Sequence, residues 1–134
     1  WETVALESGR PLSPVEKIWA SQVGVKRVQH IRIADLATLP MPEAPALRQA
    51  AKGFGLLGPD MLGIALGHGI FIRERSPGSR LISHECRHVY QYEQAGSLSA
   101  YLNTYLTEVL CFGYWDAPME VDARRHEVSS GGSR

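Results

Sequence analysis

The hydrophobic pattern changes along the chain from short apolar runs to helical periodicity. In the first half, Val25 to Ala34, Met61 to Leu66 and Gly69 to Glu74 are rich in branched apolar residues and predict strands. Gly67-His68-Gly69 predicts a turn or bulge between the second of these strands and the third. In the second half, apolar residues recur three and four positions apart, as in amphipathic helices. Strands followed by helices predict an α+β fold.

The first helix of the second half is predicted between a turn and a glycine. The turn Ser76-Pro77-Gly78-Ser79 precedes a start near Arg80, with Ser79 as the capping residue. Gly96 suits the left-handed position that follows a helix C-terminus. The apolar side between these points is supplied by Leu81, Ile82, Cys86 and Val89. We therefore expect a helix of about four turns over this segment.

Two more helices are predicted toward the C-terminus. Ser97 can cap a second helix that runs to Leu110, and Asp116-Ala117-Pro118 opens a third that runs to about Val128. One stripe of the second helix is apolar or aromatic at helical spacing and is expected to be core: Leu98, Tyr101, Leu102, Tyr105, Leu106 and Val109.

The N-terminal half is expected to hold two shorter helices and a connection. Pro14 to Val23 predicts a short helix with Ile18 and Trp19 packed inward. Ala37 to Pro45 is proline-rich and predicts an extended connection. Ala46 to Phe54 predicts another helix, which the glycines that follow it end.

The length of the chain fits one domain. Its 134 residues can bury a hydrophobic core without stabilisation by disulfide bonds or bound metal, so we expect a single domain over residues 1–134. Residues 1–12 and 129–134 are expected to be flexible. Cys86 and Cys111 do not make a disulfide framework, and the sequence is equally compatible with one bridge or with two buried thiols.

Charge and hydropathy argue against two classes of partner. The formal net charge is zero and the basic residues are scattered, which disfavours binding to a nucleic-acid backbone. No stretch approaches the roughly 18 apolar residues of a membrane span and no signal peptide is visible, so a soluble protein without membrane partners is expected. The chain begins at Trp1, and neither its compartment nor its oligomeric state can be read from the sequence.

Residues 84 to 88 carry the pattern with the most chemical content. They read H-E-x-x-H, in which one helical turn presents two zinc-binding imidazoles and a carboxylate. At about 100° per residue, His84 and His88 differ by only about 40° around the helix axis, so both can reach one ion. Glu85 flanks that ion and can act on its water, whereas Cys86 points away. The pattern predicts a zinc metallopeptidase.

A catalytic zinc site needs a third protein ligand and one open position. The extended metzincin pattern would require glycine and histidine where this chain has Gln91 and Gln94, which excludes that class. Two glutamates compete for the role. Glu108 follows the motif at a separation like that of thermolysin-like enzymes but sits at the border of the apolar stripe. Glu120 begins the third helix, and we favour it because Ala123, one turn on, lets that helix approach the motif helix closely.

Two other acidic residues, Asp116 and Asp122, are weaker candidates for the third ligand. A first-turn carboxylate such as that of Glu120 is also favoured by the helix dipole alone, so its position does not by itself identify a ligand.

Two segments together resemble a known family. The run from His84 to Tyr92, a tyrosine-rich second helix, and then the run from Ala117 to Arg124 are similar to the minimal gluzincin-type metallopeptidases. The pattern of that family is H-E-x-x-H-V-x-Q followed by P-x-E-x-E-A. The resemblance covers roughly Gly67 to Glu127 and implies that Glu120 is the third zinc ligand. Asp122 stands where the pattern has glutamate.

The resemblance also implies a fold and a substrate. A small zincin-like domain is expected, with a short mixed sheet packed on the motif helix and further helices C-terminal to it. The strand ahead of the motif helix, Gly69 to Glu74, would line the cleft and pair with an extended peptide or protein segment.

The expected mechanism follows from charge. One zinc ion per chain would lower the pKa of its bound water toward about 7, and Glu85 would serve as general base in peptide hydrolysis. An oxyanion partner is also needed, for which Tyr114 and His126 are candidates and His30 and His68 weaker ones.

Two other classes of function remain open. The chain could be a latent or non-catalytic zincin-fold module that acts in binding or regulation and keeps a metal site. It could also be an interaction domain with structural zinc or with no metal.

Overall fold

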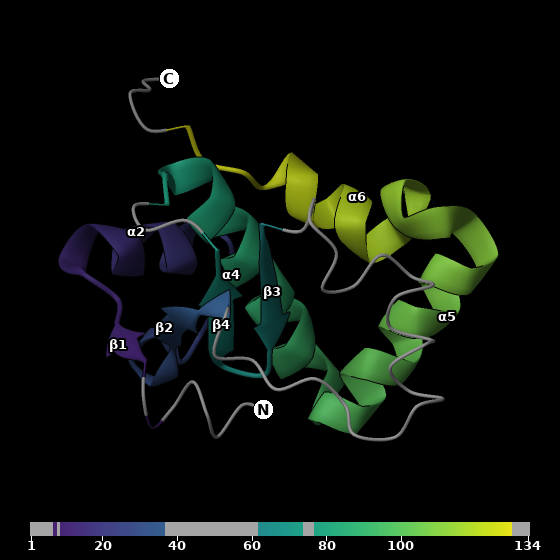
Figure 1. Cartoon of the computed structure of the whole chain (residues 1–134), viewed down its shortest axis with the longest axis horizontal. Coiled ribbons are helices and arrows are strands. Elements are labelled where there is room, and N and C mark those ends of the chain that lie inside the picture. The colour runs from purple at the N-terminus through teal and green to yellow at the C-terminus, as the bar shows by residue number, and fades with distance from the viewer. Residues whose placement is uncertain (1–6, 8, 37–61, 74–76, 130–134) are drawn as a thin grey trace.

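The structure is a computed structural model that describes residue 7 and residues 9–36, 62–73 and 77–129. Within these ranges a small four-stranded mixed sheet packs against helices (Figure 1), as the α+β prediction requires. None of the described helices is both long and apolar enough to cross a membrane. The elements are β1 (Arg10–Pro11), α2 (Pro14–Gln22), the 3₁₀ turn η1 (Val28–His30), β2 (Arg32–Asp35), β3 (Gly63–Leu66), β4 (Gly69–Ile72), α4 (Ser79–Ala95), α5 (Leu98–Asp116) and α6 (Pro118–Arg125).

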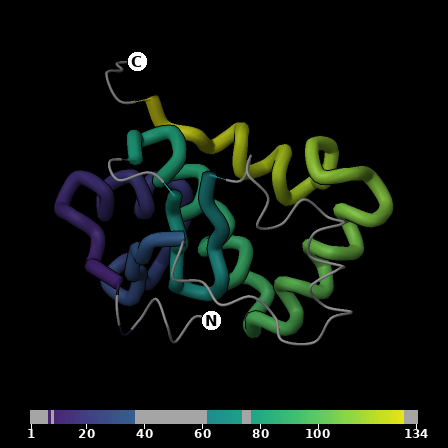
Figure 2. The backbone as a smooth tube through the Cα atoms, viewed as in Figure 1, coloured from purple at the N-terminus to yellow at the C-terminus, as the bar shows by residue number. Residues whose placement is uncertain are grey.

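The motif helix α4 lies in the middle of the molecule. The N-terminal elements β1, α2 and β2 lie to one side of it and α5 and α6 to the other, as the chain trace in Figure 2 shows. Ile82, Cys86 and Val89 recur along one face of α4 and are completely buried against the sheet and α2. Because this face is committed to the core, the histidines of the motif point to another side, where the C-terminal helices meet α4.

The strand order β1-β2-β4-β3 overturns one prediction about the sheet. β4 pairs with β2 in parallel and with β3 in antiparallel, and all four of its residues are buried. We expected Gly69 to Glu74 to pair with substrate, but β4 has a neighbour on each side and no free edge, so this prediction is wrong. The tight turn at Gly67, whose φ is 69°, folds β3 back onto β4. Among the described residues, β3 is therefore the edge strand on this side.

The strand predictions are right in place but too long. Met61 to Leu66 and Gly69 to Glu74 contain the shorter strands β3 and β4. Val25 to Ala34 is not one strand, because its middle forms the 3₁₀ turn η1 and only its end enters β2. Ile31 between these two elements is fully buried, so the apolar pattern reflected burial rather than a continuous extended backbone.

Helix α2 confirms the first predicted helix and corrects its orientation. Ser13 caps it in a reciprocal capping box with Glu16. Trp19 packs against the core as predicted, but Ile18 is 56% exposed, so its predicted inward position is wrong. The helix turns its small residue Ala20 fully inward instead.

The N-terminal segment 1–12 was expected to be flexible. Its described part contains the strand β1 and the buried Leu12, so this prediction is wrong for these residues.

The ends of α4 follow local signals. Gly78, rather than Ser79, is the N-cap, and Ser79 is the buried first residue of the helix. Gly96 ends the helix in the left-handed conformation, as predicted.

The thiols of Cys86 and Cys111 are both free, the first buried and the second exposed, so the sequence prediction of either a bridge or two buried thiols is wrong.

Helix α5 is longer than predicted and α6 is shorter. Ser97 caps α5 as expected, but the helix continues past Leu110 to Asp116 through a kink at Gly113, whose φ is 82°. Of the predicted stripe, Tyr101, Tyr105 and Val109 are buried. α6 ends at Arg125 rather than near Val128. The predictions for residues 37–54 and for residues 130–134 lie outside the described residues.

Candidate metal centre

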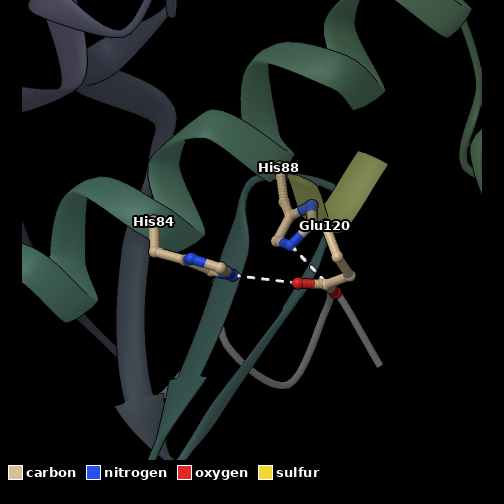
Figure 3. Close-up of side chains that lie close together, drawn as sticks. All are labelled: His84, His88 and Glu120. Carbon is tan, nitrogen blue, oxygen red and sulfur yellow. Dashed lines mark hydrogen bonds and ion pairs between the residues drawn. The ribbon is translucent and has the colours of Figure 1, made fainter. Parts of the chain in front are cut away.

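Two imidazoles and one carboxylate converge between α4 and α6. His84 and His88 project from the same side of α4 toward Glu120, which comes from α6 (Figure 3). Nε2 of His84 lies 3.1 Å from Oε1 of Glu120, and Nε2 of His88 lies 3.2 Å from Oε2. One ligand atom from each residue can be chosen so that all lie within 4.8 Å of one another. This group can hold a metal ion.

The packing of α6 against its neighbouring helices explains why Glu120 lies next to the two histidines. Ala117 is fully buried and Pro118 occupies the first turn, where its missing N–H costs nothing. Ala123 is also fully buried, and α6 contacts both α4 and α5. Ala117 packs with Tyr105 and Val109 of α5, so small buried residues at the two ends of α6 let it lie close to its neighbouring helices. Glu120 lies between the two alanines and is only 3% exposed.

The competing glutamate has a different place. Oε1 of Glu108 accepts a hydrogen bond of 2.8 Å from the backbone N–H of Met119, so Glu108 satisfies a free donor at the start of α6. Asp122 binds Arg87, and Asp116 is exposed at the end of α5. Of the acidic residues considered from the sequence, the structure brings Glu120 to the two histidines.

The far nitrogens of both histidines are hydrogen bonded. Nδ1 of His84 lies 2.9 Å from Oε2 of Glu127, and Nδ1 of His88 lies 2.8 Å from Oε1 of Gln91. Both partners are acceptors, so each Nδ1 carries a hydrogen, and in the metal-free chain each Nε2 also directs a hydrogen at Glu120. A metal ion would take the place of the two hydrogens on Nε2. Metal-ligating histidines are oriented in the same way.

Glu127 reaches His84 because the chain after α6 is fixed to α4. The backbone N–H of Val128 donates a 2.7 Å hydrogen bond to the hydroxyl of Ser83. That hydroxyl is fully buried and itself donates to the carbonyl of Ser79 at 2.6 Å. The segment that carries Glu127 is thereby held against the motif helix.

Charges within the group reinforce one another. Burial disfavours the charged form of His84, but hydrogen bonding to Glu120 and the negative charges of Glu85, Glu120 and Glu127 outweigh it and raise its pKa to about 9. Burial likewise opposes ionisation of Glu120, yet hydrogen bonds from His84 and His88 lower the pKa of its carboxyl. The Tyr105 hydroxyl donates a further 2.7 Å hydrogen bond to Oε2 of Glu120. Glu120 is therefore held as a carboxylate at this position.

Glu85 lies beside the group and is buried. Burial raises the pKa of its carboxyl, while His88 and His84 counteract part of the shift. A Cβ placed on Gly63 of β3 would lie only 3.3 Å from Oε2 of Glu85. The carboxylate is thus seated between the motif helix and the edge strand, at a point where the strand has no side chain.

The two predicted oxyanion partners differ in position. Tyr114 follows the kink at Gly113, and burial together with the negative charges of Glu120 and Glu85 raises the pKa of its phenol. His126 lies at the end of α6, where its Nδ1 is 2.8 Å from the carbonyl oxygen of Asp122. The charges of the centre therefore act on Tyr114, whereas the described contacts of His126 tie it to its own helix.

The weaker oxyanion candidates belong to another part of the molecule. His68 contacts Glu93 near the C-terminal end of α4, and its ring packs edge-on against that of His30.

Sequence reasoning missed three side chains that support the centre. Tyr105 was assigned to the core stripe, although its hydroxyl is the polar tip that a buried tyrosine must satisfy. Gln91 was used to exclude the metzincins and as part of the family pattern, but its contact with His88, three residues before it on the same helix side, was not predicted. Glu127 gave no signal, because its position depends on the chain after α6.

Comparisons with known proteins add no relative. No protein-family model, curated protein or solved structure matches this chain. The gluzincin resemblance therefore remains an expectation drawn from the two motifs, and the functional argument depends on the geometry of the centre.

Proposed function

We propose that this protein is a zinc-dependent metallopeptidase of the gluzincin type with a zincin-like fold, which binds one zinc ion per chain through His84, His88 and Glu120. The observation that carries the proposal is the pair of Nε2 atoms that face one carboxylate while both Nδ1 atoms are held by acceptors. Glu85, buried on the next position of the same helix, supplies a base beside them.

The donor set fits zinc. Tetrahedral ligands at about 2.0–2.1 Å from zinc lie about 3.3 Å from one another. The nitrogen to oxygen separations of 3.1 and 3.2 Å are close to this spacing, but each histidine faces a different oxygen of the carboxylate. One ligand atom from each residue lies within 4.8 Å of the others, so a small contraction around the ion would complete the site. Two histidines and one glutamate also leave a fourth position open, as catalytic zinc sites require. Because two histidines and a carboxylate suit Fe(II) as well, the identity of the metal is part of the test.

The residues of the chain have distinct roles in the proposed hydrolysis. Zinc held at this site would act as a Lewis acid and make water acidic enough to lose a proton near neutral pH. Glu85 accepts that proton and delivers it to the leaving amine. Its raised pKa suits both transfers, because a carboxyl closer to neutrality holds a proton longer than an exposed one does. Tyr114 keeps its proton at neutral pH and can donate to the developing oxyanion.

The edge strand β3 replaces β4 as the proposed binding site for the peptide backbone. Among the described residues β3 has one strand neighbour, β4, so its other edge can accept an added strand. Gly63 on this strand lies directly beside Glu85. A peptide paired with β3 would therefore pass close to the proposed base, with recognition mainly through its main chain.

The decisive experiment combines metal analysis with Glu85→Gln. The wild-type protein should contain about one zinc per chain. It should also cleave peptides of an unstructured peptide library, with the cleavage products identified by mass spectrometry. Glu85→Gln should retain the zinc and lose cleavage by about 10²- to 10⁴-fold, because only the base is removed. Glu93→Gln, the same substitution on the same helix but away from the centre, should remain active.

Three outcomes contradict the proposal. Iron in place of zinc would indicate different chemistry. Zinc without cleavage in the wild-type protein would favour the latent or regulatory module. Cleavage that survives in Glu85→Gln would remove this residue from the mechanism.

A further inference from the structure

The amide of Gln91 can have only one orientation in this structure. Its Nε2 lies 2.9 Å from the carbonyl oxygen of Met119 and 3.0 Å from Oδ2 of Asp122. Both partners are acceptors, so the NH₂ group must face them and the amide oxygen must face Nδ1 of His88, 2.8 Å away. Reversing the amide would set its oxygen against two other oxygens.

Both acceptors that fix Gln91 belong to α6. Met119 and Asp122 flank Glu120 on this helix. The amide oxygen can accept but not donate, so it keeps a hydrogen of His88 on Nδ1 and leaves Nε2 as the nitrogen that faces Glu120 and can exchange its hydrogen for a metal ion. The same helix thus supplies Glu120 and, through Gln91, selects the nitrogen of His88 that keeps its hydrogen when metal binds.

Asp122 is itself held in place by α4. Arg87 donates to both oxygens of this carboxylate, at 2.7 and 3.3 Å. The same guanidinium donates a 2.6 Å hydrogen bond to the carbonyl of Val23, just after α2. The ion pair with Arg87 therefore fixes the carboxylate of Asp122 where it accepts from the amide of Gln91.

We propose that Gln91 is a positioning residue that couples the docking of α6 to the tautomer of His88, so that the second imidazole and Glu120 become competent to bind metal together. This inference rests on the proposed metal centre, but the hydrogen bond from Nδ1 of His88 can be measured without metal. The pair of substitutions Gln91→Glu and Asp122→Asn keeps an acceptor for His88 at position 91 and places a donor to it at position 122. The carbonyl oxygen of Met119 loses its donor in this pair, so we expect only part of the affinity to return.

The test uses the full chain with Gln91→Met, which keeps the size and removes the amide. Zinc affinity, measured by competition with a chromophoric chelator, should fall by about 10- to 100-fold, as is typical when the partner of a ligating histidine is lost. The double variant Gln91→Glu/Asp122→Asn should recover part of that loss. Gln94→Met, an exposed position on the same helix, should leave the affinity unchanged.

The second measurement distinguishes positioning from simple packing. In the zinc-free protein, the Nδ1–H proton of His88 should be hydrogen bonded and exchange slowly with solvent, as followed by ¹⁵N-edited NMR, in the wild type and in the double variant. In Gln91→Met this proton should exchange faster.

Particular results would overturn the inference. They are unchanged Nδ1–H exchange and zinc affinity in Gln91→Met, an equal loss in Gln94→Met, or a double variant that folds without a protected Nδ1–H. If Gln91→Met does not fold, the double variant decides alone. Absence of zinc or of cleavage in the wild type would refute the proposed function, while the Nδ1–H exchange would still decide the role of Gln91.

Discussion

Helix α4 makes a histidine to glutamate contact at two places, and only one of them has the features of a metal centre. Near its C-terminal end, Glu93 accepts from the backbone N–H groups of Lys26 and Arg27 and lies 2.9 Å from Nε2 of His68. Near its middle, Glu120 faces the Nε2 atoms of two histidines. Both carboxylates have a lowered pKa, although burial opposes the shift in each case.

The difference lies in what else the partners hold. The oxygens of Glu93 are occupied by two consecutive backbone donors, so this carboxylate joins the chain after α2 to α4 and the β3–β4 turn. At the centre, each imidazole is held from behind through Nδ1, and both Nε2 atoms point at one place. A paired histidine and glutamate therefore does not by itself indicate a metal site. Convergence of several potential ligand atoms, with each imidazole held by an outer hydrogen bond, is the informative feature.

The largest expected effect separates the two glutamates that competed for the third ligand. Glu120→Ala should weaken zinc binding by more than about 100-fold, since loss of an outer partner alone costs about 10- to 100-fold. Glu108→Ala should retain zinc and lower the free energy of unfolding by about 0.5–2 kcal/mol, because it leaves a donor at the start of α6 unpaired. Equal zinc loss in the two variants, measured by chelator competition, would contradict the assignment.

A glycine substitution tests whether the edge strand and the proposed base must fit closely. Gly63→Ala places a methyl 3.3 Å from Oε2 of Glu85 and 3.2 Å from the carbonyl oxygen of Phe71, so the carboxylate must shift. We expect kcat/KM for peptide cleavage to fall by about 10- to 100-fold with zinc retained. Gly78→Ala is the control, because a Cβ there meets nothing within 4 Å. Full activity in Gly63→Ala would show that Glu85 tolerates displacement.

The other histidine to glutamate pair is expected to affect stability alone. Glu93→Gln replaces one acceptor oxygen by an NH₂ group beside backbone donors, which should lower the free energy of unfolding by about 1–3 kcal/mol. Zinc content and cleavage should not change. Denaturant unfolding with parallel metal analysis measures both quantities, and a loss of zinc in this variant would remove the distinction between the two regions.

The smallest expected effect is the number of protons that the protein releases when it binds zinc. The pKa of His84 is about 9 in the folded zinc-free chain against an ordinary 6.5, because its carboxylate neighbours outweigh burial. Protonated His84 therefore stabilises the zinc-free fold fully below pH 6.5, and this contribution is lost as the pH rises through about 9. Zinc needs the lone pairs of both rings, and hydrogen bonding to Glu120 also raises the pKa of His88 above its ordinary value, so zinc binding near pH 7.5 should release at least one proton. Calorimetry in buffers of different ionisation enthalpy gives the number, and no release would contradict the raised pKa.

Local signals in the sequence predicted the helices well. The capping box of Ser13 and Glu16, the left-handed Gly96 and the cap Ser97 each act within a few residues of the helix end that they fix. The pattern of His84, Glu85 and His88 is local in the same sense, because one helical turn determines its geometry.

Features that depend on distant segments were not predicted. The identity of the edge strand depends on β2 pairing with β4 across a long stretch of sequence, so Gly69 to Glu74 was given the wrong neighbour. Tyr105 and Glu127 acquire their roles only when α6 and the chain after it dock. The choice of Glu120 over Glu108 had a sequence basis in Ala123, whose small side chain allows that docking.

The parallel pairing of β2 with β4 has a kinetic consequence. Joining these strands closes a long loop, whereas the turn at Gly67 closes a very short one, and loop closure becomes entropically more expensive with length. The β3–β4 hairpin and the three helices that carry the centre follow one another in sequence. We expect these near-neighbour contacts to form early and the N-terminal strands to join late. The metal-binding half of the molecule would then take shape before the sheet is complete.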